Sequence, residues 1–244
     1  DSSVFIGCIN LTSITLPSSL ISIGVSAFNG CRNLKEIDFS GCASLEIIDE
    51  GAFSFCDGLI NVDLSSCTNL KEIGYYAFED CYSLASIILP SSLEIINEDA
   101  FNSCRGLTRV DLSNCTSLTS IGSSAFSGCS SLKSINFSGC TSLEIIDEEA
   151  FYGCSDLVGK LDLINCRSLT SIEQSAFENC YSLTSITLPS SLTSVDNRAF
   201  DGCYALAEVY NYSPNITVEL WYDIGQYAKV VYNASDLTGE KPTS

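Results

Sequence analysis

Cysteine is the residue type with the greatest chemical potential in this chain, because its 244 residues include 14 cysteines and no histidine. The absence of histidine removes Ser-His-Asp and Cys-His catalysis and every zinc site that uses an imidazole ligand. No Cys-x-x-Cys pair occurs, and every cysteine falls at a recurring position. The sequence therefore predicts no enzyme, no catalytic or metal-binding residue and no cofactor.

The cysteines form two columns of repeated positions. Nine follow a Phe by three residues, and five lie in a second position, at Cys42, Cys67, Cys115, Cys140 and Cys166. We expect buried free thiols, with those of the second column donating weakly to turn carbonyls. Stacked repeats would bring equivalent Cα atoms to about 5 Å, within disulfide range, but with parallel Cβ vectors. One or more disulfides, such as Cys42 with Cys67, remain the alternative.

The elements that position these residues are set by an internal repeat. An Ala-Phe dipeptide recurs eight times at intervals of 23 to 26 residues, and Phe5 with Cys8 has the same spacing. The longer unit reads Leu34-x-x-Ile37-x-Phe39-x-x-Cys42-x-x-Leu45, which matches the leucine-rich-repeat pattern with Cys in place of Asn. A shorter unit has Leu-Pro-Ser-Ser-Leu as its turn, at 16–20, 89–93 and 188–192.

This pattern predicts an α/β-type solenoid of leucine-rich repeats, with a curved parallel sheet on one face and short helical or irregular return segments. We expect residues 1–210 to form the solenoid and residues 211–244 to form a C-terminal cap and polar tail. One extra residue near 158–160 predicts a strand bulge or a loop insertion. Acidic residues precede several Ala-Phe pairs, and a helix N-terminus there would favour them electrostatically, with a cation or partner site as the alternative.

The candidate site is the outward face of the predicted sheet, because alternate strand residues point away from the core. Asp38 and Asp63 should lie on adjacent strands, where two charges about 5 Å apart in water repel by only about 0.8 kcal/mol. Two interpretations stay open: a solvated polar face, or an acidic strip that meets a basic partner with two cations setting the register. The candidate contact residues are Glu36, Asp38, Asp63, Arg109, Asp111, Lys160, Asp162 and Tyr210.

Aromatic residues gather near the C-terminus, where a cap over the open solenoid end or an aromatic contact surface would use them. The segments 216–222 and 228–232 have the composition of strands. The aromatic residues are Tyr204, Tyr210, Tyr212, Trp221, Tyr222, Tyr227 and Tyr232.

Composition narrows the classes of partner. With 30 acidic and 11 basic residues the formal charge is −19, which disfavours nucleic acid and anionic lipid headgroups. No apolar run approaches the roughly 18 residues of a membrane span, so we expect no membrane insertion.

The absence of an initiator Met and of a signal peptide suggests a processed product or a fragment. Six Asn-x-Ser/Thr sequons would matter only in a secreting eukaryote.

Units such as Leu118-Thr-Ser-Ile121-Gly-Ser-Ser-Ala125-Phe126-Ser-Gly-Cys129-Ser-Ser-Leu132 closely resemble the BspA-like, or Treponema pallidum-type, leucine-rich repeats. The resemblance covers about residues 4–210. It implies a secreted or cell-surface, adhesin-like binding module that recognises a protein, such as a host matrix or cell-surface component, through the sheet face. A structural spacer or display stalk is the alternative, and we expect a monomer. Cysteine in two columns departs from the family's usual pattern.

Overall fold

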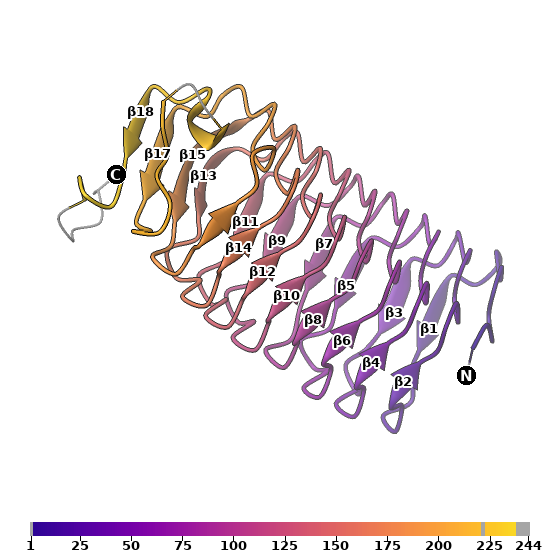
Figure 1. Ribbon diagram of the computed structural model, residues 1–244. Helices are drawn as coiled ribbons and strands as arrows, with labels where there is room; N and C mark the ends of the chain where they lie inside the picture. Colours follow the sequence, from indigo (N-terminus) through magenta and orange to yellow (C-terminus); the bar gives the residue numbers. More distant parts are fainter. Residues whose placement is uncertain (1, 221–222, 238–244) are drawn as a thin grey trace.

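Most coils of the chain contain two short strands joined by turns, because their apolar residues occur in two short groups. The structure, a computed structural model, describes residues 2–220 and 223–237. The coils stack side by side into an elongated solenoid with the two chain ends at opposite ends of the stack (Figure 1). The core inside the stack is one continuous apolar cluster of Leu, Ile, Val, Phe, Ala and Cys.

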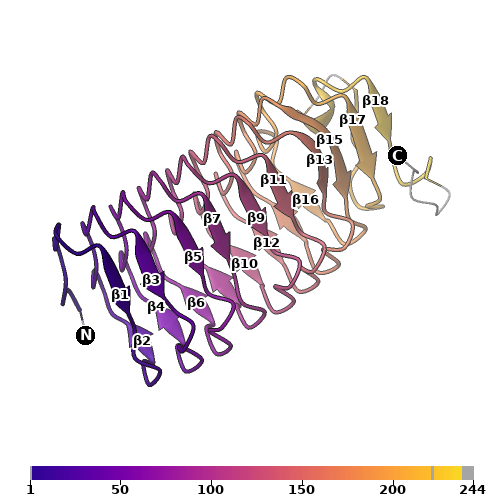
Figure 2. The ribbon, with the colours of Figure 1, turned by 180° about the vertical axis from the view of Figure 1, so that it is seen from behind.

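The longer strands line one side of the stack as a parallel series, which we call the long-strand sheet (Figure 2). Hydrogen bonds join its strands in three groups: β1 with β3, then β5, β7, β9 and β11, then β13, β15, β17 and β18. The strands are β1 (Ser13–Thr15), β3 (Glu36–Asp38), β5 (Asn61–Asp63), β7 (Ser86–Ile88), β9 (Arg109–Asp111), β11 (Ser134–Asn136), β13 (Gly159–Asp162), β15 (Leu183–Leu188), β17 (Glu208–Asn211) and β18 (Val230–Tyr232). In each three-residue strand the central residue points inward and its two neighbours point outward.

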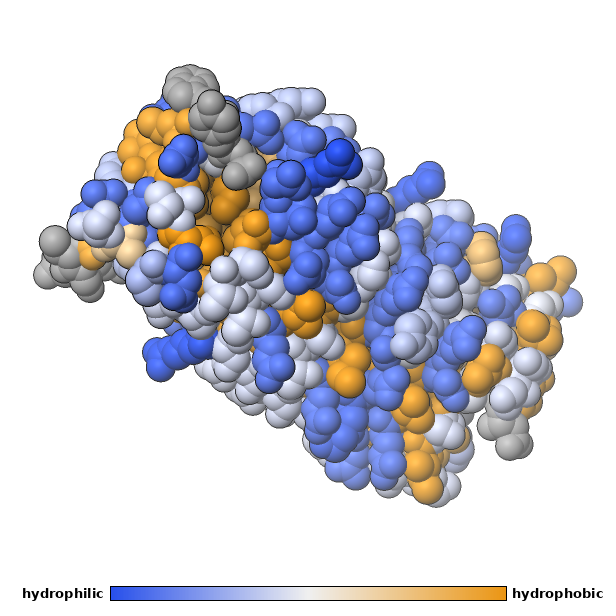
Figure 3. Space-filling model, viewed as in Figure 1, coloured by the Kyte–Doolittle hydropathy of each residue, from blue (hydrophilic) through white to orange (hydrophobic). Residues whose placement is uncertain are grey.

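A second parallel sheet, the short-strand sheet, lies on the other side of the core and was not predicted. Its eight strands have two residues each, too short for their alternation to stand out in a sequence. They are β2 (Ser22–Ile23), β4 (Ile47–Ile48), β6 (Glu72–Ile73), β8 (Ile95–Ile96), β10 (Ser120–Ile121), β12 (Ile145–Ile146), β14 (Ser171–Ile172) and β16 (Ser194–Val195). Hydrophilic residues cover most of this side of the molecule (Figure 3).

The return segments are turns, so the irregular alternative is the one found. Within residues 2–220 and 223–237 the only helix is the 3₁₀ turn η1 (Asp223–Gly225), and the α/β description is not confirmed. Most returns carry two residues of positive φ, as at Asp99 (55°) and Ser103 (58°). A left-handed residue interrupts the i to i−4 hydrogen-bond series of a helix. The predicted helix N-terminus is therefore absent, and Asp49 and Asp147 instead accept hydrogen bonds from the next backbone N–H.

Backbone groups of the returns bond to the neighbouring coil instead. The amide of Phe53 donates to the carbonyl of Ala77 at 2.7 Å, and the amide of Phe101 donates to that of Ala125 at the same distance. The Phe side chains form a ladder from Phe5 to Phe200, with ring centroids 5.0 to 5.3 Å apart and nearly parallel planes. Offset-stacked rings at this spacing are a favourable arrangement. The returns thus hold adjacent coils together through both backbone and side chain.

The first cysteine column belongs to the same ladder. Eight of its thiols donate to the carbonyl of a Phe in the preceding coil at 3.0 to 3.4 Å. In the second column, Cys115, Cys140 and Cys166 make longer contacts of 3.6 to 3.9 Å to turn carbonyls, as predicted. All 14 cysteines are free and 13 are buried. The prediction that the whole column is buried is wrong for Cys8, which is exposed in the first coil.

The C-terminal part of the stack departs from the regular repeat in its strand register and at its end. The extra residue near 158–160 coincides with a shift of the strand register, because Gly159 of β13 pairs with Leu183 whereas Lys160 pairs with Ser185. Near the C-terminus, β18 adds to β17 within the segment expected to be a strand, whereas residues 216–220 form none. Trp221 and Tyr222 lie outside the described residues. The backbone N–H of Val218 donates to Asn233 Oδ1, and Asn233 Nδ2 donates to the Val218 carbonyl, which holds the segment 216–220 against the end of the stack.

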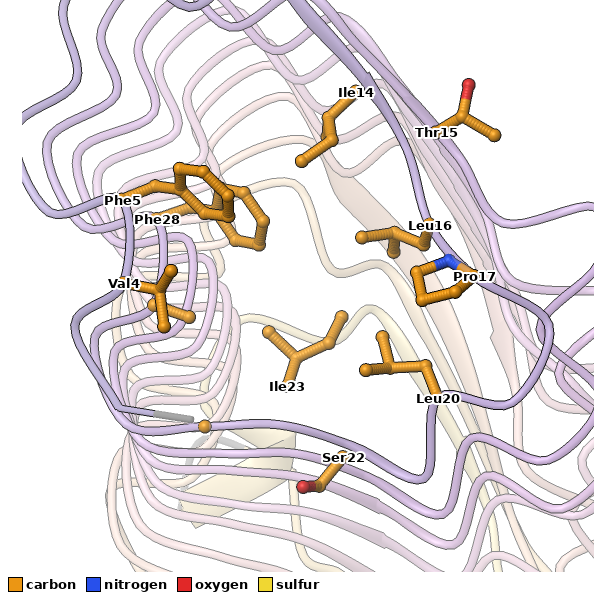
Figure 4. A pocket seen from close by; sticks show the side chains of 12 residues that line it. Val4, Phe5, Ile14, Thr15, Leu16, Pro17, Leu20, Ser22, Ile23 and Phe28 are labelled. Carbon is orange, nitrogen blue, oxygen red and sulfur yellow. The ribbon is translucent and has the colours of Figure 1, made fainter.

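At the N-terminal end, residues 2–11 form turns and no strand, so the interior of the next coil is open (Figure 4). Phe5, Ile14, Leu16 and Ile23 point into this hollow, whereas Thr15 points away from it. The hollow is the open end of the apolar core, which in the other coils is covered by the next coil.

In the part of the chain that the structure describes, no helix is long and apolar enough to cross a membrane.

The thiol ladder predicts a simple labelling pattern. Burial raises the pKa of Cys129 to about 12, so at about pH 8 its thiol is protonated and unreactive. We expect a thiol reagent to modify Cys8 at least about 100-fold faster than the other 13 cysteines, which react only on unfolding. Cys8→Ser should remove the fast phase. Two or more rapidly labelled thiols in the native protein would contradict the ladder.

Candidate functional site

The outward side chains of the long-strand sheet form two columns that run the length of the stack. We call this surface the long-strand face. Its first column is Ser13, Glu36, Asn61, Ser86, Arg109, Ser134, Lys160, Ser185, Glu208 and Val230, and its second is Thr15, Asp38, Asp63, Ile88, Asp111, Asn136, Asp162, Thr187, Tyr210 and Tyr232. All eight predicted contact residues lie in these columns. They are spread over five coils, however, and do not converge on one point.

The acidic residues of the second column have a structural role at the strand end. One carboxylate oxygen of Asp38 accepts a hydrogen bond from the backbone N–H of Ser40 at 2.9 Å. The same bond joins Asp63 to Ser65, and it recurs at Asp111, Asn136 and Asp162 over 2.9 to 3.3 Å. Such side-chain-to-backbone bonds stabilise a turn two residues on. The hydrogen bonds from Ser40 lower the pKa of Asp38, so this carboxylate stays ionised.

Proline accounts for three of the five positions at which the column lacks an acidic or amide residue; Tyr210 and Tyr232 occupy the other two. In the three Leu-Pro-Ser-Ser-Leu coils the second-column residue is Thr15, Ile88 or Thr187, and the residue two positions on is Pro17, Pro90 or Pro189. Proline has no backbone N–H to donate, so an acceptor two residues before it would have no partner in the turn. The choice of Asp or Asn in this column thus follows the turn chemistry, and the repeated aspartates alone do not indicate a binding site.

The two cations of the face pair within their own strands. Arg109 contacts Asp111 at 2.7 Å and Lys160 contacts Asp162 at 3.3 Å. Burial raises the pKa of Asp111, but the hydrogen bonds from Ser113 and the charge of Arg109 outweigh it, so the pKa is lowered overall. Exposed ion pairs of this kind contribute little to stability. They do leave the C-terminal half of the face nearly neutral, whereas Glu36, Asp38 and Asp63 in the N-terminal half have no cation in either column.

Tyr210 lies in a short aromatic row at the C-terminal end of the face. Its ring stacks on that of Tyr232 with centroids 5.1 Å apart, and the Lys160 ammonium lies 6.0 Å from the Tyr210 centroid. The Tyr210 hydroxyl donates to Glu208 at 3.1 Å. Burial, followed by this bond, raises the pKa of Tyr210, so the phenol stays protonated. The row adds apolar ring surface to a polar face.

Ile88 is a functional candidate that sequence reasoning missed. It is 51% exposed in the middle of the second column, in register with Asp63 on one side and Asp111 on the other. Next to it the surface has a notch, lined by Ser65, Ile88, Leu89, Pro90, Ser91, Ser113, Asn114 and Thr116. The notch exists because the Leu-Pro-Ser-Ser-Leu turn is shorter than the turns on either side. The signal in the sequence was the one aliphatic residue in a polar column.

A second depression lies between β3 and β5, where no ladder of hydrogen bonds joins the two strands. Its walls include Glu36, Asp38 and Asp63, with Ile60 and Lys35 beside them. Among the described residues no group of three or more His, Cys, Asp or Glu side chains could hold a metal ion. The acidic walls instead suit a cationic side chain with an aliphatic stem.

Stacked coils with parallel strands on two sides of a shared core define a parallel-strand β-solenoid. The family model described as "BspA type Leucine rich repeat region (6 copies)" matches residues 1–118 and 115–219. The chain therefore belongs to this family, which confirms the resemblance found in the sequence.

Solved structures agree with this assignment. The T. pallidum leucine-rich-repeat protein is 30% identical, over 75% of this chain and 69% of that chain, with a TM-score of 0.48. A leucine-rich-repeat protein from Eubacterium ventriosum is 18% identical over 98% of this chain and 81% of that chain, with a TM-score of 0.54. The pneumococcal vaccine antigen PcpA is 22% identical over 95% and 68%, with a TM-score of 0.50. No curated protein sequence matches the chain.

The strand-end hydrogen bond predicts how the aspartates respond to substitution. Asp63→Ala should lower the free energy of unfolding by about 1 kcal/mol, because the Ser65 amide loses its acceptor. Asp63→Asn should change it by less than about 0.5 kcal/mol, since Asn136 makes the same bond. Urea unfolding measures both. Thr15→Ala, ahead of Pro17, is the control and should have no effect. Equal losses for the Ala and Asn variants would refute the turn role.

Proposed function

We propose that the chain is a secreted or cell-surface module that binds another protein through the long-strand face. Membership of the BspA type family supports a protein-interaction role and no catalytic one. One similar structure is named a vaccine antigen, which is in keeping with display at a surface. The partner is a host matrix or cell-surface protein, and the chain acts as a monomer.

The observation that carries this proposal is the uncovered, continuous row of outward side chains on a rigid stack. Hydrogen bonds and stacked rings join every described coil to its neighbours, so the row is held in fixed register. Preorganised surfaces bind with a smaller loss of conformational entropy. The face combines charges with a tyrosine pair and an exposed isoleucine, a mixture that protein interfaces use.

The contacts are assigned to the eight candidate residues: Glu36, Asp38, Asp63, Arg109, Asp111, Lys160, Asp162 and Tyr210. Residues 1–210 form the binding solenoid in this proposal. Residues 211–244 act as its C-terminal cap and tail, a role supported by the pairing of β18 with β17.

The test is binding to a panel of matrix and epithelial surface proteins with a charge-removal variant that keeps the turns. Asp38, Asp63, Asp111 and Asp162 are changed together to Asn, which retains the acceptor for the turn amide. Binding should weaken by at least about tenfold at low salt, because four carboxylates leave the face.

The matched control removes four carboxylates beside the short-strand sheet: Glu46, Glu72, Glu94 and Glu144 are changed together to Gln. This control should bind as the unaltered protein does. If it weakens binding and the Asp variant does not, the contact surface lies on the other side of the stack. If no protein of the panel binds, the proposed function is wrong, and the alternative of a structural spacer or display stalk is favoured.

A further inference from the structure

Three neighbouring features of the long-strand face form a continuous docking surface in its N-terminal half. They are the acidic depression between β3 and β5, the exposed side chain of Ile88 on β7, and the notch beside Leu89 and Pro90. Asp63 lines the depression and is also in register with Ile88. The anionic and apolar parts of the surface are therefore adjacent.

Charge determines what fits the depression. Glu36, Asp38 and Asp63 face outward there, and Lys35 at the rim is the one cation among the lining residues. The exposed side chain of Ile60 offers apolar surface to the stem of a long cation. Phosphate groups of lipids or nucleic acids would be repelled, so a Lys or Arg side chain of a protein is the complementary group.

Ile88 and the notch favour an apolar side chain next to that cation in the bound segment. Exposing an aliphatic side chain to water costs free energy, and covering it with another apolar side chain is favourable. Leu89 and Pro90 are buried and form the floor of the notch, and the hydroxyl and amide groups of Ser65, Ser113 and Asn114 border it. An aliphatic side chain of modest size, such as Val or Leu, could pack over Ile88 and into the notch.

The spacing of the coils sets the geometry of the occupant. The rungs of the Phe ladder at this level, Phe53 and Phe78, are 5.1 Å apart, so the depression and Ile88 are separated by between one and two coil spacings. In an extended chain, side chains two residues apart are about 6.6 Å apart and point the same way. Strands β5 and β7 already pair with each other, so the occupant crosses them along the solenoid axis.

We propose that this surface docks an extended protein segment in which Lys or Arg stands two residues from Val, Leu or Ile. The inference rests on the proposed function and adds to it the partner's chemistry and the half of the face that it uses. Ile88 becomes the central contact. Arg109, Lys160 and Tyr210 lie beyond the reach of this segment, where other parts of the same partner contact the face.

The test is selection from a displayed library of random peptides of about nine residues on the immobilised chain. Three variants are selected in parallel: Ile88→Thr, Asp63→Asn and, beside the short-strand sheet, the control Glu144→Gln. Thr15 and Thr187 occupy the equivalent position in the other Leu-Pro coils, so Thr is compatible with this turn. Thermal unfolding checks that every variant folds.

We expect peptides with a cation two residues from an aliphatic residue to be enriched on the unaltered chain and on the Glu144→Gln control. Affinity for such a peptide should fall by about tenfold in Ile88→Thr and about threefold or more in Asp63→Asn. No such enrichment, or enrichment that both variants retain, overturns the inference. If the protein panel still binds in that case, the proposed function stands with its contacts elsewhere on the face.

Discussion

The stacking of one coil on the next is the constraint on which the rest of the structure depends. No coil encloses a core of its own, so its apolar side chains are buried only against the coils before and after it. The Phe rings of successive coils lie 5.0 to 5.3 Å apart, and the returns, the short strands and, within three groups, the long strands hydrogen-bond from one coil to the next. Cysteine suits the first column because a small thiol fits the ladder and still donates to a Phe carbonyl. The same regularity carries the outward side chains in straight columns.

A repeated residue on such a surface can serve the coil rather than a ligand. The second-column aspartates are the clearest case, because they appear where the following turn has a backbone N–H to satisfy and are absent where that turn has a proline. Departures from the repeat are more informative about binding. Ile88 is exposed without a structural reason in its own coil, and the shorter turn beside it opens the notch. The unbalanced charge over β3 and β5 is a second departure.

The sequence predicted much of the fold, because the 23- to 26-residue period, the inward Leu and Ile positions and the extra residue near Gly159 are all local patterns. It missed the short-strand sheet, since two residues carry no readable alternation, and it allowed helices in the returns. Left-handed residues such as Tyr76, Asp99 and Ser124 exclude them there, and their types do not reveal that conformation. The outward position of the eight candidate residues was predicted from the alternation of the strands. Their internal ion pairs, the strand-end hydrogen bonds and the depressions depend on neighbouring coils and could not be.

Hydrogen exchange of the backbone amides tests most directly the claim that neighbouring coils hold every side of the stack. The amides of Phe53, Phe78, Phe101 and Phe126 lie in turns, yet each donates to the next coil at 2.7 Å. The account predicts that they exchange as slowly as the amides of the long strands β5 to β11, with protection close to that set by global unfolding. Exchange at the rate of exposed loops would show that the returns open independently, and it would contradict the rigid stack that presents the long-strand face.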